Sequence, residues 1–257
     1  MIAPTVLAFL GDFGKGLDFI FHERESVSGG VQVGGLGQVG GLALTHVEVS
    51  AAAMALGTAL AAPLGLYLGH KGRGQFIATS ISNVGRAVPI LALIAFFIAF
   101  IGVGFTNVAL ALTLLAIPPI LTNTYVGVRQ VDRDVIDAAE GMGMSGSQII
   151  WRVRLPLALP TFFGGVRTSA VSVLATATIA PLANVQTLGE PVLNPQTYGF
   201  PGTIGASIVV ALITLGTDAG LGVVQRLVTP KGIKLAQGGR NAKGFSIPLV
   251  RRREQPT

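Results

Sequence analysis

The sequence predicts an all-α integral membrane protein with about five membrane-spanning helices. Half of its 257 residues are hydrophobic, only 12% are charged, and the mean hydropathy is +0.65. A soluble domain usually has about 25% charged residues. The charges are also segregated, so that several long stretches contain almost none. One such stretch is compatible with a soluble core, but four or five indicate a bilayer.

Five stretches are long and apolar enough, or nearly so, to cross the hydrocarbon core. The core is about 30 Å thick and a helix rises about 1.5 Å per residue, so a span needs about 20 residues. The third stretch is short, and Pro118-Pro119 interrupts it. Two GxxxG pairs, Gly65/Gly69 and Gly216/Gly220, allow close helix packing within one subunit or between two. The predicted spans are residues 47–68, 76–100, 106–122, 162–182 and 203–227.

Lysine and arginine are distributed asymmetrically about these spans. Fourteen of the 18 fall in the 70–75 loop, the 123–160 loop and the tail from Arg226, which lie on one side of a five-span chain. The opposite side contains only Lys15 and Arg24. Positively charged loops stay in the cytoplasm, so the expected location is a cell membrane, with the N-terminus outside and the C-terminus inside. The net charge is +6, but the basic residues lie at the ends of the predicted spans and not along one polar face, so they do not indicate a nucleic-acid partner.

The chain is expected to divide into three parts. Residues 1–45 contain no full span and form an extracellular segment, with a short interfacial helix over 9–20 and a flexible glycine-rich linker over 29–41. Residues 46–228 form the membrane domain, and residues 229–257 a basic cytoplasmic tail. The linker contains a GxGxxG match, but dinucleotide binding needs that motif inside a strand–turn–helix unit. A connector is the better interpretation.

The 123–160 loop is the longest one on the predicted cytoplasmic side. Asp132 or Asp134 can cap a helix N-terminus by accepting hydrogen bonds from backbone N–H groups, and Gly141 and Gly143 favour the end of that helix. The apolar residues of this helix share one face at helical spacing, namely Val135, Ile136, Ala139 and Met142.

A second short helix is predicted from Gln148 to Arg154, ending at Leu155-Pro156. The two helices together are amphipathic and are expected to lie against the membrane. Acidic residues interleaved with arginines, together with the small Ala138 and Ala139, suit close approach by a cytoplasmic protein. From the residues alone, a docking site and an ordinary connecting loop are both compatible with this pattern.

The same loop carries a motif. The motif begins with Asp137-Ala138-Ala139, has Gly143 after three further residues, and ends nine residues later with Val153-x-Leu155-Pro156. This spacing resembles the EAA-x3-G-x9-I-x-LP signature of ABC importer permeases. Asp137 stands in the place of Glu, and Val153 in the place of Ile. The resemblance implies the type I, MetI-like arrangement of spans with a cytoplasmic coupling helix. The residues that it assigns to coupling with the ATPase are Asp137, Ala138, Ala139, Glu140, Gly143, Leu155 and Pro156.

Other segments are similar to the branch of this family that imports osmoprotectants such as glycine betaine, carnitine and choline. One departure is Leu188-Gly189-Glu190-Pro191, where the branch commonly has a Gly-Gly-Leu-Gly-like run. The resemblance implies osmoprotectant import, with the alternative of an ABC permease for another small solute such as an amino acid. The similar segments are Ser82–Pro89, Leu121–Gly127, Gly141–Met144, Leu155–Pro160 and Gly165–Thr168.

The resemblance also implies the partners and an alternating-access mechanism. The chain has no GxxxxGK(S/T) phosphate loop, so it is not itself an ATPase, and hydrolysis would come from cytoplasmic ABC ATPase subunits. An extracellular or periplasmic binding protein would deliver the substrate, and a second permease subunit, identical or different, would complete the pathway. No cofactor or metal is expected, because the chain has no cysteine and its three histidines are scattered.

Three of the polar residues within the predicted spans are candidates for a pathway or gating role. Asn83 and Arg86 lie in the second span near Pro89, and Asp218 lies in the last span. A charge at the bilayer centre costs about 2.5–3.5 kcal/mol, so these residues are expected to face the bundle or water, in a structural, pathway or gating role. An ion-coupled secondary transporter is the remaining alternative. It would need intramembrane carboxylates, of which only Asp218 is available.

Overall fold

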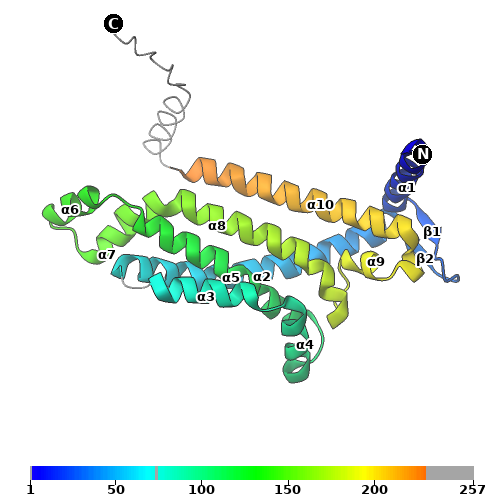
Figure 1. Cartoon of the computed structure of the whole chain (residues 1–257), viewed down its shortest axis with the longest axis horizontal. Helices are drawn as coiled ribbons and strands as arrows, with labels where there is room; N and C mark the ends of the chain where they lie inside the picture. The colour runs from blue at the N-terminus through cyan, green and yellow to red at the C-terminus, as the bar shows by residue number, and fades with distance from the viewer. Residues whose placement is uncertain (1, 73–74, 230–257) are drawn as a thin grey trace, which may run out of the picture.

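The computed structural model describes residues 2–72 and 75–229, so the predicted tail beyond residue 229 lies outside the described residues. Long helices run side by side, with a β-hairpin at one end of the bundle and two short helices at the other (Figure 1). In chain order the elements are α1 (Ile2–Phe21), β1 (Glu23–Glu25), β2 (Gln32–Gly34), α2 (Gly35–Lys71), α3 (Gln75–Ala87), α4 (Ile90–Ile101), α5 (Phe105–Arg129), α6 (Arg133–Gly141), α7 (Gly146–Ile149), a π-helical turn (Ile150–Arg154), α8 (Leu155–Thr176), a 3-10 helix (Ala177–Ala183), α9 (Gly189–Leu193) and α10 (Pro195–Val228).

Four helical stretches in the described residues are long and apolar enough to cross a membrane. They are α2, α5, the stretch Gly146–Ala183 that contains α8, and α10. A fifth crossing would consist of α3 and α4, which are bent by 87° relative to each other. The prediction of an all-α membrane protein with about five spans is therefore confirmed, although the second span is not a straight helix.

The bend between α3 and α4 is located at Pro89. Proline has no backbone N–H and disfavours helical geometry in the residue before it, so α3 ends at Ala87 and α4 begins at Ile90. The Pro89 backbone is extended, with φ −65° and ψ 126°. α4 therefore leaves the bundle and projects from its side (Figure 1). The second predicted span, over 76–100, is therefore a bent pair of helices with its break at Pro89.

α5, in contrast, continues without a break through Pro118 and Pro119. Both prolines lie against glycines of neighbouring helices. A Cβ atom on Gly85 of α3 would lie 2.5 Å from Pro118 Cγ, and one on Gly165 of α8 would lie 2.7 Å from the Pro119 carbonyl oxygen. Contacts with neighbouring helices let membrane proteins tolerate proline inside a helix. The predicted interruption of the third span therefore does not occur.

The glycine-rich segment forms a hairpin turn and the start of a helix, and the prediction of a flexible linker over 29–41 is wrong. β1 and β2 pair antiparallel with Arg24 opposite Val33, and α2 begins directly at Gly35 and extends across residue 45. Gly29 and Gly30 have φ values of 79° and 78°. Residues with a side chain rarely adopt this left-handed region, so the glycines encode a tight turn.

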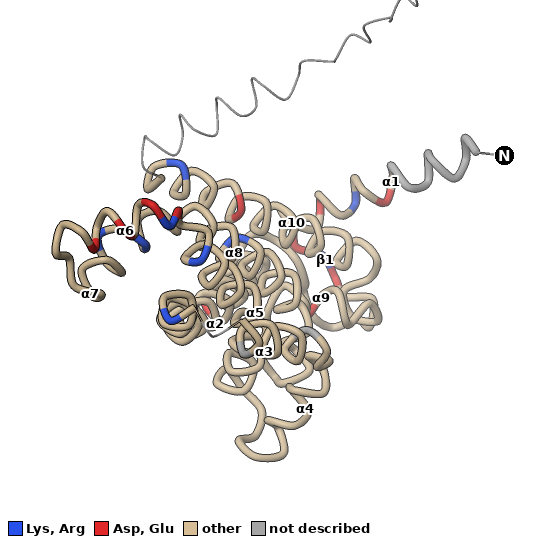
Figure 2. The backbone as a smooth tube through the Cα atoms, turned by 60° about the vertical axis from the view of Figure 1, so that its left-hand side comes forward, with Lys and Arg blue, Asp and Glu red and all other residues tan. Residues whose placement is uncertain are grey.

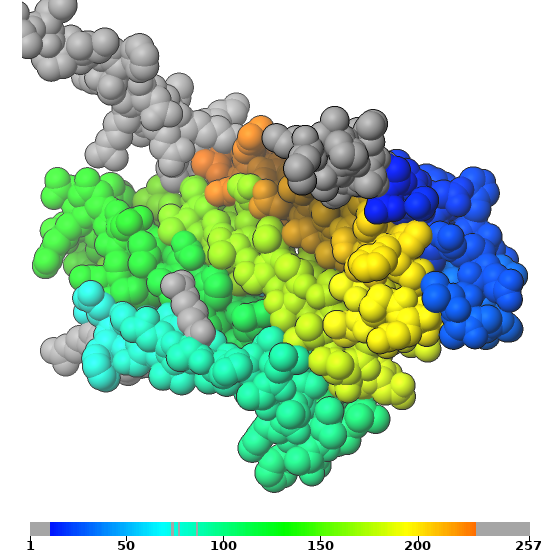
Figure 3. Space-filling model, turned by 45° about the vertical axis from the view of Figure 1, so that its right-hand side comes forward, coloured from blue at the N-terminus to red at the C-terminus, as the bar shows by residue number. Residues whose placement is uncertain are grey.

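α1 and the hairpin pack against the start of α10 (Figure 3). A Cβ atom on Gly205 of α10 would lie only 2.6 Å from the carbonyl oxygen of Gly16 in α1. The N-terminal helix is thus longer than the predicted 9–20 segment and is attached to the bundle. The buried apolar residues of this end are Phe19, Ile20, Val33, Val39, Leu42 and Leu188.

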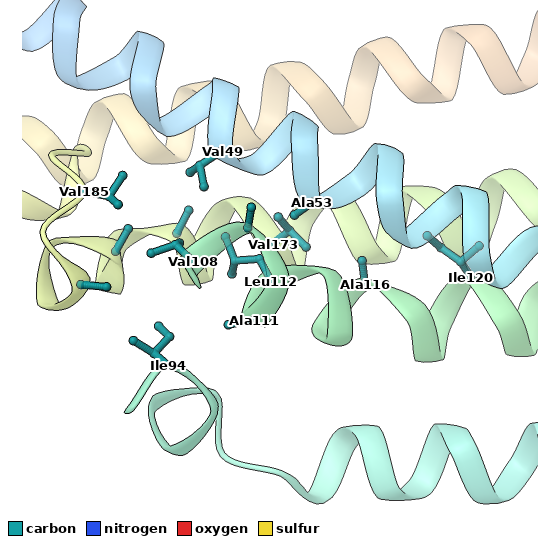
Figure 4. Packing of buried hydrophobic residues seen from close by; sticks show 14 of the residues in the cluster. Val49, Ala53, Ile94, Val108, Ala111, Leu112, Ala116, Ile120, Val173 and Val185 are labelled. Carbon is teal, nitrogen blue, oxygen red and sulfur yellow. The ribbon is translucent and has the colours of Figure 1, made fainter. Parts of the chain in front are cut away.

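The main hydrophobic core surrounds α5, which lies between α2 and α8 (Figure 4). Glycines of α2 permit a very close approach to α5. A Cβ atom on Gly57 would lie 2.8 Å from Ala116 Cβ, one on Gly65 would lie 2.7 Å from Thr124 Cβ, and one on Gly69 would lie 2.8 Å from Val128 Cβ. The Gly65/Gly69 pair therefore packs within one subunit. A Cβ atom on Gly216 or Gly220 of α10 would meet nothing within 4 Å.

Replacing Gly65 by leucine should weaken the folded protein, because the new side chain has no space between α2 and α5. Overpacking of this kind typically costs about 1–3 kcal/mol, so we expect a lower midpoint of thermal unfolding in detergent. Gly216→Leu is the matched control, since that position is open. Equal unfolding midpoints for the two variants would contradict the packing argument.

Candidate functional site

α6 and α7 lie beyond the end of the bundle, between the end of α5 and the start of α8 (Figure 1). α6 begins where the Asp132 carboxylate accepts a hydrogen bond from the backbone N–H of Asp134, at 3.0 Å. Asp132 is therefore the N-cap. Charged residues of both signs gather on this segment, whereas most of the bundle is uncharged (Figure 2). The segment has the polarity of a surface that contacts water or a soluble protein.

A small hydrophobic cluster holds α6 against α7. Ile136, Ala139 and Ile149 are buried together, and Val131, Met144 and Val153 pack around them. Val135 and Met142 are 43% and 76% exposed, so the predicted four-residue apolar face is only partly correct. α6 has nine residues and packs mainly on one short neighbour. It can therefore bury only a narrow stripe.

The turn between α6 and α7 has a fixed geometry. Gly143 has φ +78°, a conformation that favours glycine, and the N–H of Met144 donates to the carbonyl oxygen of Ala139 at 3.2 Å. Ser145 and Gln148 then form a capping box, in which the Ser145 N–H donates to Gln148 Oε1 at 2.8 Å. Reciprocal capping of this kind satisfies N–H groups that are otherwise unpaired at a helix start.

α7 continues directly into α8. The π-helical turn Ile150–Arg154 joins the two helices without a loop, so the prediction that the second short helix ends at Leu155-Pro156 is wrong. Pro156 lies in the first turn of α8. Because proline has no backbone N–H, it cannot donate the next i to i−4 hydrogen bond, and the π turn before it widens the helix at this point. The α6–α7 pair is therefore connected to a membrane-spanning helix by continuous helix.

The residues predicted for coupling occupy different places in this arrangement. Asp137, Ala138 and Glu140 are exposed on α6, whereas Ala139 is only 2% exposed and forms part of the buried cluster. Gly143 forms the exposed turn. Leu155 and Pro156 are half-buried at the start of α8. A partner that approached α6 would contact Asp137, Ala138 and Glu140, whereas Ala139 packs on the opposite face of the helix, against α7.

A second polar group lies within the membrane-spanning part. Arg167 of α8 donates from Nε and Nη2 to the two carboxylate oxygens of Asp218 in α10, at 2.8 Å each, and from Nη1 to Gln225 Oε1 at 3.1 Å. Gln225 Nε2 in turn donates to the Pro160 carbonyl oxygen at 2.8 Å. The sequence placed Asp218 in a span but did not identify Arg167 as its partner. Opposite charges in two different spans were the signal for this pairing.

The other two polar positions are less informative. Asn83 is exposed on α3, and the Arg86 side chain lies outside the described residues. Their pathway or gating role stays a prediction.

Several apolar spans, an ion pair between two of them and a polar helix pair at one end define a multi-pass membrane protein. Residues 61–232 match the family of binding-protein-dependent transport system inner membrane components, and the chain belongs to this family. It is therefore the permease subunit of an ABC importer, a component of the membrane without catalytic activity whose ATPase is a separate subunit.

Relatives and solved structures agree with this assignment. The chain is 36% identical over 195 residues to the carnitine transport permease protein OpuCB of Listeria monocytogenes, covering 76% of this chain and 89% of the relative. It is 34% identical over 190 residues to the glycine betaine/carnitine/choline transport system permease protein OpuCB of Bacillus subtilis (strain 168), covering 74% and 88%. The structure resembles a chain of the inward-facing MetNI methionine ABC transporter, with a TM-score of 0.67, 19% identity, and coverage of 76% and 98%. The predicted type I, MetI-like fold is confirmed.

Ala139→Arg should detach α6 from α7, because the buried cluster has no room for a guanidinium group. We expect faster amide hydrogen exchange across α6 than in the unmodified chain. Ala138→Arg, one residue away on the exposed face, should leave the exchange unchanged. Unaltered exchange in Ala139→Arg would show that the cluster does not hold the helix.

Proposed function

We propose that this permease takes part in the import of an osmoprotectant such as glycine betaine, carnitine or choline. The observation that supports this substrate class is the identity of 36% and 34%, over most of the chain, with relatives named for carnitine, glycine betaine and choline transport. All three compounds carry a quaternary ammonium group. Uptake of radiolabelled glycine betaine by cells that contain the assembled importer tests the proposal directly.

The subunit would act with three kinds of partner. Two cytoplasmic ABC ATPases would drive the cycle, an extracellular or periplasmic binding protein would deliver the substrate, and a second permease subunit would complete the pathway. The family supports this composition. In the proposed cycle, ATP-driven closure of the ATPases switches the permease pair between inward-open and outward-open states.

The exposed face of α6, formed by Asp137, Ala138 and Glu140, is proposed as the contact with the ATPase. The capped ends of α6 and α7 and the buried cluster between them support a stiff element at this position. Because α7 passes into α8 through the π turn, a displacement of α6 would be transmitted to a membrane-spanning helix. α8 carries Arg167, so the motion would reach the polar group in the membrane.

Ala138→Arg should prevent docking of the ATPase while the permease still folds. We expect co-purification of the ATPase and glycine betaine uptake to fall at least about tenfold, which corresponds to about 1.4 kcal/mol in an equilibrium constant. Ser28→Arg, at the exposed hairpin on the opposite end of the bundle, is the control for ATPase association. Normal co-purification and uptake with Ala138→Arg would refute the docking assignment.

The proposed orientation, with the N-terminus outside and the C-terminus in the cytoplasm, can be tested without background labelling because the chain has no cysteine. Ser28→Cys in the hairpin and Ser147→Cys in α7 are both exposed positions. In intact cells, a thiol reagent that does not cross membranes should label Ser28→Cys only. After permeabilisation it should label both. Labelling of Ser147→Cys in intact cells would reverse the orientation and remove the docking surface from the cytoplasm.

A further inference from the structure

The Arg167–Asp218 pair lies several turns inside two membrane-spanning helices, nearer to the end of α10 than to its start. Arg167 is 12 residues beyond Leu155, about 18 Å along α8, and Asp218 is ten residues before Val228, about 15 Å along α10. The two side chains are 34% and 35% exposed. Charged groups at this depth face protein or water and avoid lipid. The open side of the pair must therefore face an aqueous pathway or another protein surface.

The surroundings of the pair favour an aqueous pathway. Arg167 and Asp218 open into a cleft of about 460 Å³, which Gly164, Thr168, Val171 and Ser172 also line. The hydroxyl groups of Thr168 and Ser172 donate to backbone carbonyl oxygens of their own helix. Their oxygen lone pairs can still accept hydrogen bonds in the cleft. The groove of about 620 Å³ between α2, α8 and α10 is lined instead mainly by aliphatic side chains, as expected for a surface that meets lipid.

Arg167 also keeps unused binding capacity. A guanidinium group has five N–H donors, and three of them bind Asp218 and Gln225. The other two have no hydrogen-bond partner in the described part of the chain. A planar guanidinium group binds carboxylates in a bidentate manner. The cleft therefore offers a carboxylate receptor and a neighbouring anion within one site.

We propose that this pair is a transit site for a zwitterionic substrate that carries a quaternary ammonium group and a carboxylate. The substrate carboxylate binds Arg167 and its ammonium group lies against Asp218, as the two side chains separate. This inference rests on the proposed function. One internal ion pair is replaced by two ion pairs with the substrate, so no charge is left unpaired within the two spans. A cation without a carboxylate would leave Arg167 without a counter-ion.

The same arrangement explains why the site would hold its ligand only briefly. Tight quaternary ammonium sites surround the cation with aromatic rings, and none of the six residues that line this cleft is aromatic. The substrate would also compete with an existing bidentate ion pair. When the substrate leaves, Arg167 and Asp218 pair again, so the six residues that line the cleft present no unpaired charge that could attract inorganic ions.

The first test neutralises both partners at once. Arg167→Gln/Asp218→Asn leaves no unpaired charge and can keep a hydrogen bond between α8 and α10, so the importer should assemble normally. We expect glycine betaine uptake to fall at least tenfold, while the ATPase activity stimulated by the binding protein and glycine betaine stays within twofold of the unmodified importer. Arg226 is an exposed arginine of α10, the helix that also carries Asp218. Arg226→Gln is therefore the matched control and should leave uptake unchanged.

The second test separates recognition of the carboxylate from helix packing. Glycine betaine and choline share the trimethylammonium group, but only glycine betaine has a carboxylate. In Arg167→Gln, we expect the ratio of glycine betaine uptake to choline uptake to fall at least tenfold. If the unmodified importer moves glycine betaine and not choline, the binding protein can account for that selectivity, and the double variant alone decides.

The outcomes distinguish the two proposals. If the unmodified importer moves none of glycine betaine, carnitine and choline, the proposed function fails and the transit site fails with it, whereas uptake of choline alone would overturn only the transit site. If the unmodified importer moves glycine betaine, three results would overturn the transit site alone. These are normal uptake by the double variant, loss of stimulated ATPase activity together with uptake, and equal losses of glycine betaine and choline uptake in Arg167→Gln.

Discussion

The close contact between α2 and α5 is the constraint on which the rest of the bundle depends. Hydrophobic burial drives helix association only weakly inside a bilayer, because lipid tails are as apolar as the side chains. Close packing must supply much of the attraction instead. Gly57, Gly65 and Gly69 bring the two backbones together, and this fixes α5 as the centre of the molecule. On its other side, Gly165 of α8 meets the Pro119 carbonyl oxygen.

This packing determines where the functional elements can lie. α5 and α8 are held together through Gly127 and Gly165, so the segment between them, α6 and α7, leaves from one end of a rigid pair. α8 also bonds to α10 through Arg167, Asp218 and Gln225. The α6–α7 pair that carries the proposed ATPase contact is thus joined by continuous helix to α8, which also lines the polar cleft. A single moving part would connect nucleotide hydrolysis to the pathway.

The sequence predicted the elements whose physical signal is local. Span length and hydropathy identified the crossings, and the two candidate caps, Asp132 and Asp134, placed the start of α6 to within two residues. Predictions failed where a distant contact decided the outcome. Pro118 and Pro119 predicted a break in the third span, but glycines on α3 and α8 make room for them and the helix continues. The glycine-rich segment read as a linker, but its positive φ values make a hairpin turn.

For the site residues too, local patterns were predictable from the sequence and contacts between distant segments were not. The spacing of Asp137 and Ala138 placed both on one short helix, where the structure has them exposed. The apolar face indicated that Ala139 could be buried, but its partner Ile149, ten residues later, belongs to the next helix and lies outside that pattern. Arg167 and Asp218 are 51 residues apart. Their pairing required the packing of α8 against α10, which no short-range pattern contains.

The bend between α3 and α4 at Pro89 has a consequence for the surrounding lipid. α3 has 13 residues, so it is about 20 Å long, whereas the hydrocarbon core is about 30 Å thick. α4 cannot make up the difference because it turns away by 87°. The bent pair is therefore either a broken span, beside which the acyl chains are compressed at a cost of fractions of a kcal/mol for each Å of mismatch, or a re-entrant loop that enters and leaves the bilayer on one side.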